Sequence, residues 1–172
     1  MFKSKKKIAV LTLATLSLLA VTAVGFAQRH HLIAAIARPE VKVQLSAAVE
    51  RGSELVPLDK ASAVKPGEVL DWTIVSENSG NAAARDYKAV ARIPRGTEFI
   101  AGSAKADGAK AVYSIDNGKS FSEKPTVEEK QTDGTVKRVA APVAMYTDIR
   151  YEWSDPLAQG GKLSASYKLR VK

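Results

Sequence analysis

The sequence predicts an all-β fold, an antiparallel sandwich of about seven strands that covers residues 41–172. Three observations support this prediction. Apolar and polar residues alternate with a period of two in several short segments, as they do in half-buried strands. Turn sequences rich in glycine, proline, asparagine and aspartate separate these segments. Helical periodicity does not occur after Glu40, so strands and turns account for the whole region.

The expected strands begin at Val41 and follow one another at short intervals. In the second of them, Trp72 lies between Leu70 and Ile74 on one face. We expect Trp72 and Trp153 to be the large core residues between two facing sheets, because aromatic side chains bury the most apolar area. The expected strands are residues 41–49, 70–75, 86–93, 97–100, 111–115, 119–121, 148–153 and 162–172.

The last expected strand has the most regular pattern, with one apolar face and one basic face. A shift of its register by one residue would bury three lysines and an arginine, so the register is strongly fixed. Lysines on an edge strand also discourage edge-to-edge aggregation. The basic face is the candidate partner surface, formed by Lys162, Lys168, Arg170 and Lys172.

A hairpin is expected at Asn117-Gly118, because both residues tolerate positive φ between two extended segments. The segment from Ser114 to Phe121 also fits the Ser-x-Asp-x-Gly-x-x-aromatic pattern of an Asp-box, in which the Asp side chain hydrogen-bonds turn amides. We therefore predict that Asp116, Asn117 and Gly118 form a structural turn. Residues 123–138 are polar, and we expect a long loop or a second, exposed hairpin there.

Residues 1–27 have the organisation of a secretory signal: a basic start, an uncharged apolar run over 8–27, and small residues at its end. Gly25 and Ala27 would stand at the −3 and −1 positions of a cleavage site before Gln28. An uncleaved membrane-anchor helix is the alternative, since the run is about long enough to span a bilayer. Both interpretations place the domain outside the cytoplasmic membrane. Residues 28–40 form a connector.

Composition excludes several classes of protein. The formal charge is +8, and removing the four lysines that precede Ile8 lowers it to +4, with acidic and basic residues interleaved. Such a charge favours solubility rather than nucleic-acid binding. The chain contains no cysteine, which excludes disulfides, thiolate metal sites, a cysteine nucleophile and a lipid anchor through cysteine.

The order of turns and strands resembles that of a known family. Pro66-Gly67-Glu68 precedes one strand, Asn78-Ser79-Gly80 follows it, and residues 93–103 read Ile-Pro-Arg-Gly-Thr-Glu-Phe-Ile-Ala-Gly-Ser. Residues 153–161 then lead into the final strand. This order resembles the conserved repeat domain of bacterial surface proteins, the family called domain of unknown function eleven. The resemblance implies an immunoglobulin-like sandwich outside a prokaryotic cell, without catalytic residues. The family usually occurs in tandem copies, and this chain carries one.

No arrangement of residues indicates catalysis or a cofactor. His30 and His31 are adjacent and point to opposite sides of an extended chain, so they make a poor metal pair, and they lie beside the signal segment. Carboxylates are frequent in residues 123–133, where a solvated loop is favoured over a weak calcium site. We expect no catalytic, cofactor-binding or metal site.

We therefore expect a non-catalytic structural or binding module of the bacterial cell envelope or surface, in a periplasmic, cell-surface or extracellular location. The expected partner is an envelope or surface protein or an anionic envelope polymer. Two alternatives stay open. The Asp-box and the aromatics would suit an exported carbohydrate-active or carbohydrate-binding protein. Retention of the apolar run would make the chain a membrane-tethered subunit of an envelope assembly, the one case with membrane contact.

Overall fold

The computed structural model describes residues 37–172, and their strands confirm the all-β class with antiparallel sheets. The predicted signal segment and most of the connector lie outside the described residues. Residues 39–172 pack as one unit. Within the described range, the only helical element is one 3₁₀ turn, η1 (Val143–Met145). No helix in this part of the chain is long and apolar enough to cross a membrane.

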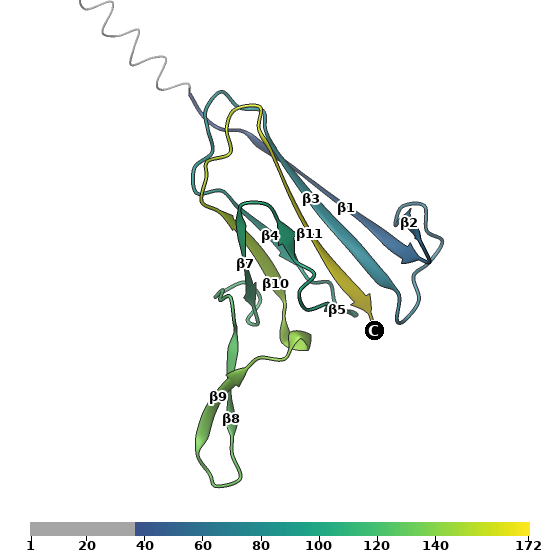
Figure 1. Cartoon of the computed structure of the whole chain (residues 1–172), viewed down its shortest axis with the longest axis vertical. Helices are drawn as coiled ribbons and strands as arrows, with labels where there is room; N and C mark the ends of the chain where they lie inside the picture. Colours follow the sequence, from purple (N-terminus) through teal and green to yellow (C-terminus); the bar gives the residue numbers. More distant parts are fainter. Residues whose placement is uncertain (1–36) are drawn as a thin grey trace, which may run out of the picture. The chain divides into compact units, whose positions relative to one another are not determined.

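The larger sheet has the strand order β2-β1-β3-β11-β5, and β6 also pairs with β11. Three long neighbours, β1, β3 and β11, dominate it (Figure 1). Alternating apolar residues specify these strands, because one face of each meets the core. The bounds are β1 (Val41–Arg51), β2 (Glu54–Pro57), β3 (Val69–Asn78), β5 (Thr97–Phe99), β6 (Lys105–Ala106) and β11 (Lys162–Val171).

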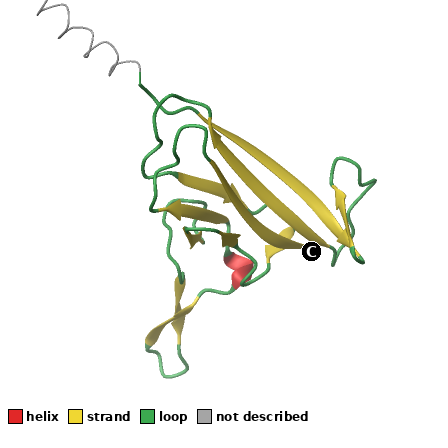
Figure 2. Cartoon of the chain, turned by 45° about the horizontal axis from the view of Figure 1, so that its top comes forward, coloured by secondary structure: helices red, strands yellow, loops and turns green. Residues whose placement is uncertain are grey.

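The smaller sheet has the order β4-β10-β7, with the bounds β4 (Lys88–Arg92), β10 (Asp148–Trp153) and β7 (Ala109–Ser114). A separate hairpin, β8 (Thr126–Lys130) with β9 (Val136–Ala140), projects from the two sheets (Figure 2). Its turn is closed by the backbone N–H of Gln131, which donates to the Thr135 carbonyl at 2.8 Å. For residues 123–138, where the sequence predicts either a long loop or an exposed hairpin, the exposed hairpin is confirmed.

The core lies between the two sheets, as in a β-sandwich. One cluster of buried side chains joins the inner face of the larger sheet to that of the smaller. Tyr151 is fully buried, and its hydroxyl crosses the core to donate a 2.7 Å hydrogen bond to the Ser166 carbonyl. The cluster consists of Val49, Leu70, Ile74, Ala89, Ala91, Ile93, Phe99, Ile149, Tyr151, Trp153, Ala165, Tyr167 and Leu169.

The two tryptophans differ in burial. Trp153 is buried in the core, and its indole N–H donates to the Asp107 carbonyl at 3.0 Å. Trp72 is only partly buried, and its ring stacks on Tyr167 with centroids 6.2 Å apart. The predicted core role is therefore confirmed fully for Trp153, while Trp72 packs at the margin of the core.

Strand β11 is a central strand of its sheet, which corrects the interpretation of its lysines as edge protection. It pairs with β3 on one side and with β5 and β6 on the other. A second correction concerns residues 119–121, which belong to a turn rather than to a strand. Alternation fixes which face of a strand is buried, but it does not say which strands become neighbours.

Asn78 anchors the point where the chain enters the domain. Its side chain is fully buried and makes four hydrogen bonds. The amide nitrogen donates to the carbonyls of Ala82 (2.7 Å) and Leu157 (3.0 Å). The amide oxygen accepts from the backbone N–H groups of Glu40 and Gly80, both at 3.1 Å. The Asn-x-Gly sequence thus joins three separate segments of the chain.

Candidate functional site

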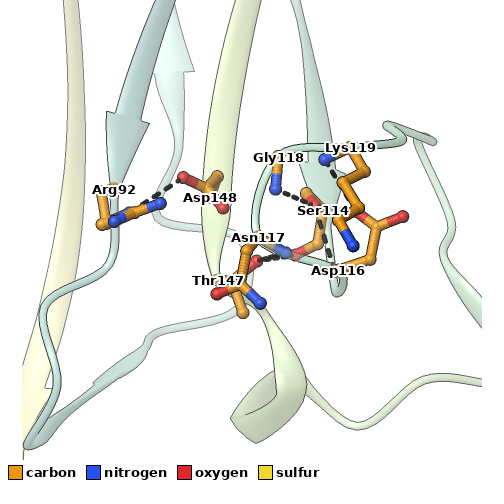
Figure 3. Close-up of polar contacts among 8 residues, drawn as sticks. All are labelled: Arg92, Ser114, Asp116, Asn117, Gly118, Lys119, Thr147 and Asp148. Atoms are coloured by element: carbon orange, nitrogen blue, oxygen red, sulfur yellow. Dashed lines mark hydrogen bonds and ion pairs between the residues drawn. The ribbon is translucent and has the colours of Figure 1, made fainter.

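The predicted Asp-box forms the loop that follows β7 (Figure 3). The Ser114 hydroxyl lies 2.7 Å from one oxygen of Asp116 and accepts the backbone N–H of Gly118 at 2.9 Å. Asp116 in turn accepts the backbone N–H groups of Lys119 and Ser120 at 3.0 and 2.9 Å. The Ser120 hydroxyl donates to its second oxygen at 2.5 Å. Asp116 is therefore engaged in closing the turn.

These hydrogen bonds to the ionised carboxylate, with the Ser120 hydroxyl as the main donor, hold the pKa of Asp116 well below its ordinary value. Such a group stays negatively charged and is unsuited to general acid catalysis at neutral pH. Asn117 and Gly118 have φ values of 60° and 80°. Glycine adopts this left-handed backbone region without steric cost. The three residues thus form a turn, as the sequence predicts.

The turn is longer than a two-residue hairpin. Tyr113 and Ser122 close it by exchanging two backbone hydrogen bonds of 2.8 and 3.0 Å. The aromatic residue of the box, Phe121, is partly buried, and the guanidinium of Arg150 lies 4.0 Å from the centre of its ring. Phe121 therefore packs against a cation on the outer face of β10.

The Asp-box turn borders a hollow with a volume of about 640 Å³. The segment after β4, the end of β11 and the residues around η1 form its other walls. Three cationic residues line it: Arg92, Arg95 and Lys172. Asn117, Thr147 and Tyr146 add polar groups. In residues 37–172, no Asp or Glu side chain lies within 4.0 Å of the cationic group of Arg95 or of Lys172.

A buried carboxylate lies beside the third cation. Asp148 is 4% exposed, and one of its oxygens lies 3.6 Å from Nε of Arg92 (Figure 3). Its other oxygen, Oδ2, has no hydrogen-bond partner among the described residues. Burying a charge without partners is costly, and Arg92 is the cation that lies beside this carboxylate. Arg92 itself is exposed at the rim of the hollow.

The predicted basic face of the last strand divides into two parts. Lys168 forms ion pairs with Glu50 and Asp71, the second at 3.7 Å, and Lys162 pairs with Glu77 at 3.2 Å. The hydrogen bond from Lys168 to Glu50 raises the pKa of this lysine. These two charges are thus compensated by acidic residues of β1 and β3.

The other two basic residues stay available. Arg170 is exposed, and Glu98 of β5 is its Cα partner across the sheet. Lys172 is exposed at the large hollow, where the structure brings it together with Arg92 and Arg95. Sequence reasoning missed both arginines of the hollow, because they lie about 80 positions from Lys172 and carry no local motif.

The remaining candidates are metal-ligating groups, the carboxylates of residues 123–133 and the two histidines. Among the described residues, no three carboxylate or histidine side chains come close enough to hold a metal ion. The carboxylates of residues 123–133 lie on or beside the projecting hairpin. His30 and His31 lie outside the described residues.

The fold defines the class, an all-β protein, and the hollow is lined by three cationic residues. Comparisons with family models, with curated proteins and with solved structures find no match to this chain.

Proposed function

We propose that this chain is an exported, non-catalytic binding module of a bacterial cell envelope, which recognises an anionic group at the hollow. The observation that carries this proposal is the convergence of Arg92, Arg95 and Lys172 around one space of about 640 Å³. Of these three residues, only Arg92 has an Asp or Glu side chain within 4.0 Å among the described residues. Convergent cations of this kind suit the carboxylates or phosphates of an envelope polymer, which arginine binds through paired hydrogen bonds.

Export and envelope location are supported by the sequence of residues 1–27, with its basic start and its uncharged run. We infer that cleavage after Ala27 releases a mature chain that begins at Gln28. Intact-mass measurement of protein recovered from the envelope or the medium tests this inference. A mass that includes Lys3 would contradict cleavage and favour the membrane-tethered alternative.

We further propose that the sandwich is immunoglobulin-like and related to the conserved repeat domain of bacterial surface proteins. When the short strands β2 and β6 are left out, the two sheets contain four and three strands, the same numbers as in an immunoglobulin constant domain. Lettered A to G along the chain, they give the orders A-B-G-D and C-F-E, whereas the constant domain has A-B-E-D and C-F-G. The proposal is thus a variant in which the fifth and seventh strands exchange places.

The absence of catalysis is supported by the chemistry of the Asp-box. Asp116 is occupied by turn hydrogen bonds, and a stabilising role in the turn accounts for each residue of the pattern. A glycosidase needs a pair of carboxylates across the scissile bond. The hollow is lined instead by cations and uncharged polar groups. This favours binding over hydrolysis.

The decisive experiment compares two double variants of the chain. Arg95→Gln with Lys172→Gln removes the two open charges of the hollow, while Lys162→Gln with Lys168→Gln removes two paired charges of the same sheet. Equilibrium binding is measured to a phosphodiester polymer (teichoic acid) and to a uronic-acid polymer (polygalacturonate). We expect the first pair to weaken binding about tenfold or more and the second pair to have a much smaller effect.

Salt and the choice of polymer complete the test. Binding should weaken as salt rises, because exposed charges are screened over about 8 Å at physiological ionic strength. Preference for one polymer identifies the anion as phosphate or carboxylate. Equal losses from the two double variants, or binding that ignores salt, would contradict recognition at the hollow.

A further inference from the structure

One side of the sandwich is open between β1 and β4. Val43 and Leu45 lie on the same face of β1 as Val49, yet they are 58% and 53% exposed whereas Val49 is fully buried. An apolar groove of about 230 Å³ separates them from β4, and Ile74 forms part of its wall. The larger sheet therefore carries apolar side chains that the smaller sheet does not cover.

The open side coincides with an unpaired strand edge. Strand β4 pairs only with β10 in the described region. In an antiparallel pair, every second residue directs its N–H and C=O groups toward the neighbour. The Ile93 N–H donates to the Thr147 carbonyl, and the Trp153 N–H donates to the Tyr87 carbonyl. These two bonds show which residues of β4 direct their backbone groups toward β10.

The alternation leaves a row of free backbone groups on the open side. Ala91 and Ala89 lie two and four residues before Ile93. Like Ile93, they therefore direct their backbone N–H and C=O groups toward β10. The N–H and C=O groups of Lys88, Val90 and Arg92 therefore face the open edge. One more strand beside β4 would satisfy these groups and would cover the apolar groove with its inward side chains.

The side chains of β4 select the composition of such a strand. Its inward residues, Ala89 and Ala91, are small and leave room for branched aliphatic side chains. Its outward residues include Lys88 and Arg92, which are both exposed. They lie 3.8 Å from Glu152 and 3.6 Å from Asp148 of β10, and β4 itself carries no acidic residue. Opposite charges stabilise cross-strand pairs, so the outward positions of an added strand favour glutamate or aspartate.

A second copy of this chain fits the edge poorly. Antiparallel pairing of two β4 strands centred on Val90 would place Lys88 of one copy opposite Arg92 of the other. Like charges at facing positions destabilise a sheet. The methyl groups of the incoming Ala89 and Ala91 would also be too short to fill the groove.

We propose that the edge of β4 is a docking site for an extended segment of a partner protein, in which aliphatic and acidic residues alternate. The segment adds a fourth strand to the smaller sheet and inserts its aliphatic side chains against Val43 and Leu45. This interaction differs from recognition of an anionic polymer at the hollow, although Arg92 borders both sites, because it uses backbone hydrogen bonds together with apolar contact.

Two capped nine-residue peptides provide the test, one alternating valine with glutamate and one alternating valine with lysine. Binding to the full chain is measured by calorimetry, and amide exchange is followed by NMR. We expect the glutamate peptide to bind and the lysine peptide to bind at least about tenfold more weakly. Binding should slow the amide exchange of Lys88, Val90 and Arg92, while Ala89 and Ala91 are already protected in the free protein.

Matched variants locate the contact. Val43→Lys places a charge in the groove and should weaken binding of the glutamate peptide about tenfold. Val136→Lys, at a valine that is 62% exposed on the projecting hairpin, should leave it unchanged. Arg95→Gln with Lys172→Gln should also leave it unchanged, which separates this site from the hollow.

Three results would overturn the proposal. The first is no binding of the glutamate peptide at millimolar concentration. The second is equal binding of the two peptides, or binding that Val43→Lys does not weaken. The third is a dimer in analytical ultracentrifugation that Val43→Lys dissociates, because the occupant would then be a second copy.

Discussion

The buried amide of Asn78 offers a direct test of how this domain is held together. Asn78→Ala removes all four side-chain hydrogen bonds while it leaves the backbone of β3 intact. Each net hydrogen bond contributes about 0.5–1.5 kcal/mol to stability. One loss is partly compensated, because the Leu157 carbonyl also accepts the Ala84 N–H at 2.9 Å. We expect the free energy of unfolding to fall by about 3 kcal/mol.

Unfolding in guanidinium chloride, followed by tryptophan fluorescence, measures this loss. Gln44→Ala is the matched control, since it removes an exposed amide from the neighbouring strand β1. Its effect should stay within about 0.5 kcal/mol. A loss of less than about 1 kcal/mol for Asn78→Ala would refute the role of this amide as a buried anchor.

Three further predictions concern the turn and the core. The low pKa of Asp116 means that its charge stabilises the fold above about pH 4, and this contribution is lost as the pH falls further; acid unfolding of Asp116→Asn should therefore depend less on pH, and an unchanged dependence would contradict the turn's role. Burial raises the pKa of Tyr167 to about 12. The neutral phenol therefore stabilises the fold below about pH 10, and this stability is lost between about pH 10 and pH 12. Phenol absorbance should show the ionisation of Tyr167 together with unfolding, and Tyr167→Phe should unfold at higher pH. Trp153→Ala should lower the free energy of unfolding by about 3–5 kcal/mol, and Trp72→Ala by less because Trp72 is only partly buried; the reverse order in denaturant unfolding would place Trp72 at the centre of the core.

The sequence was sufficient for the class of fold, because burial imposes a period of two on each long strand. Strands β1, β3, β10 and β11 coincide closely with expected segments. The short strands β2 and β6 were missed, since 4 and 2 residues are too few for a visible alternation. The central place of β11 was also missed, because alternation records the buried face of a strand and nothing about its neighbours.

The candidate site was predictable only where its chemistry is local. The Asp-box turn depends on residues within eight positions of one another, so Asp116, Asn117 and Gly118 could be assigned from the pattern. The pairing of Lys168 with Glu50 and Asp71 depends on the register of β11, β3 and β1, which no local pattern records. The hollow depends in the same way on chain segments that only the fold brings together.

The register of the three long strands also determines how the domain would respond to mechanical force. Val41 pairs with Asn78 at one end of the larger sheet, and Arg170 pairs with Val69 at the other, roughly 30 Å away. Tension between the entry and exit of the domain would thus act along the strands and load both ladders in shear. Shear strains many hydrogen bonds at once, whereas peeling breaks them one by one. Because forced unfolding is governed by the unfolding rate, a domain loaded in this way would resist pulling better than one loaded by peeling.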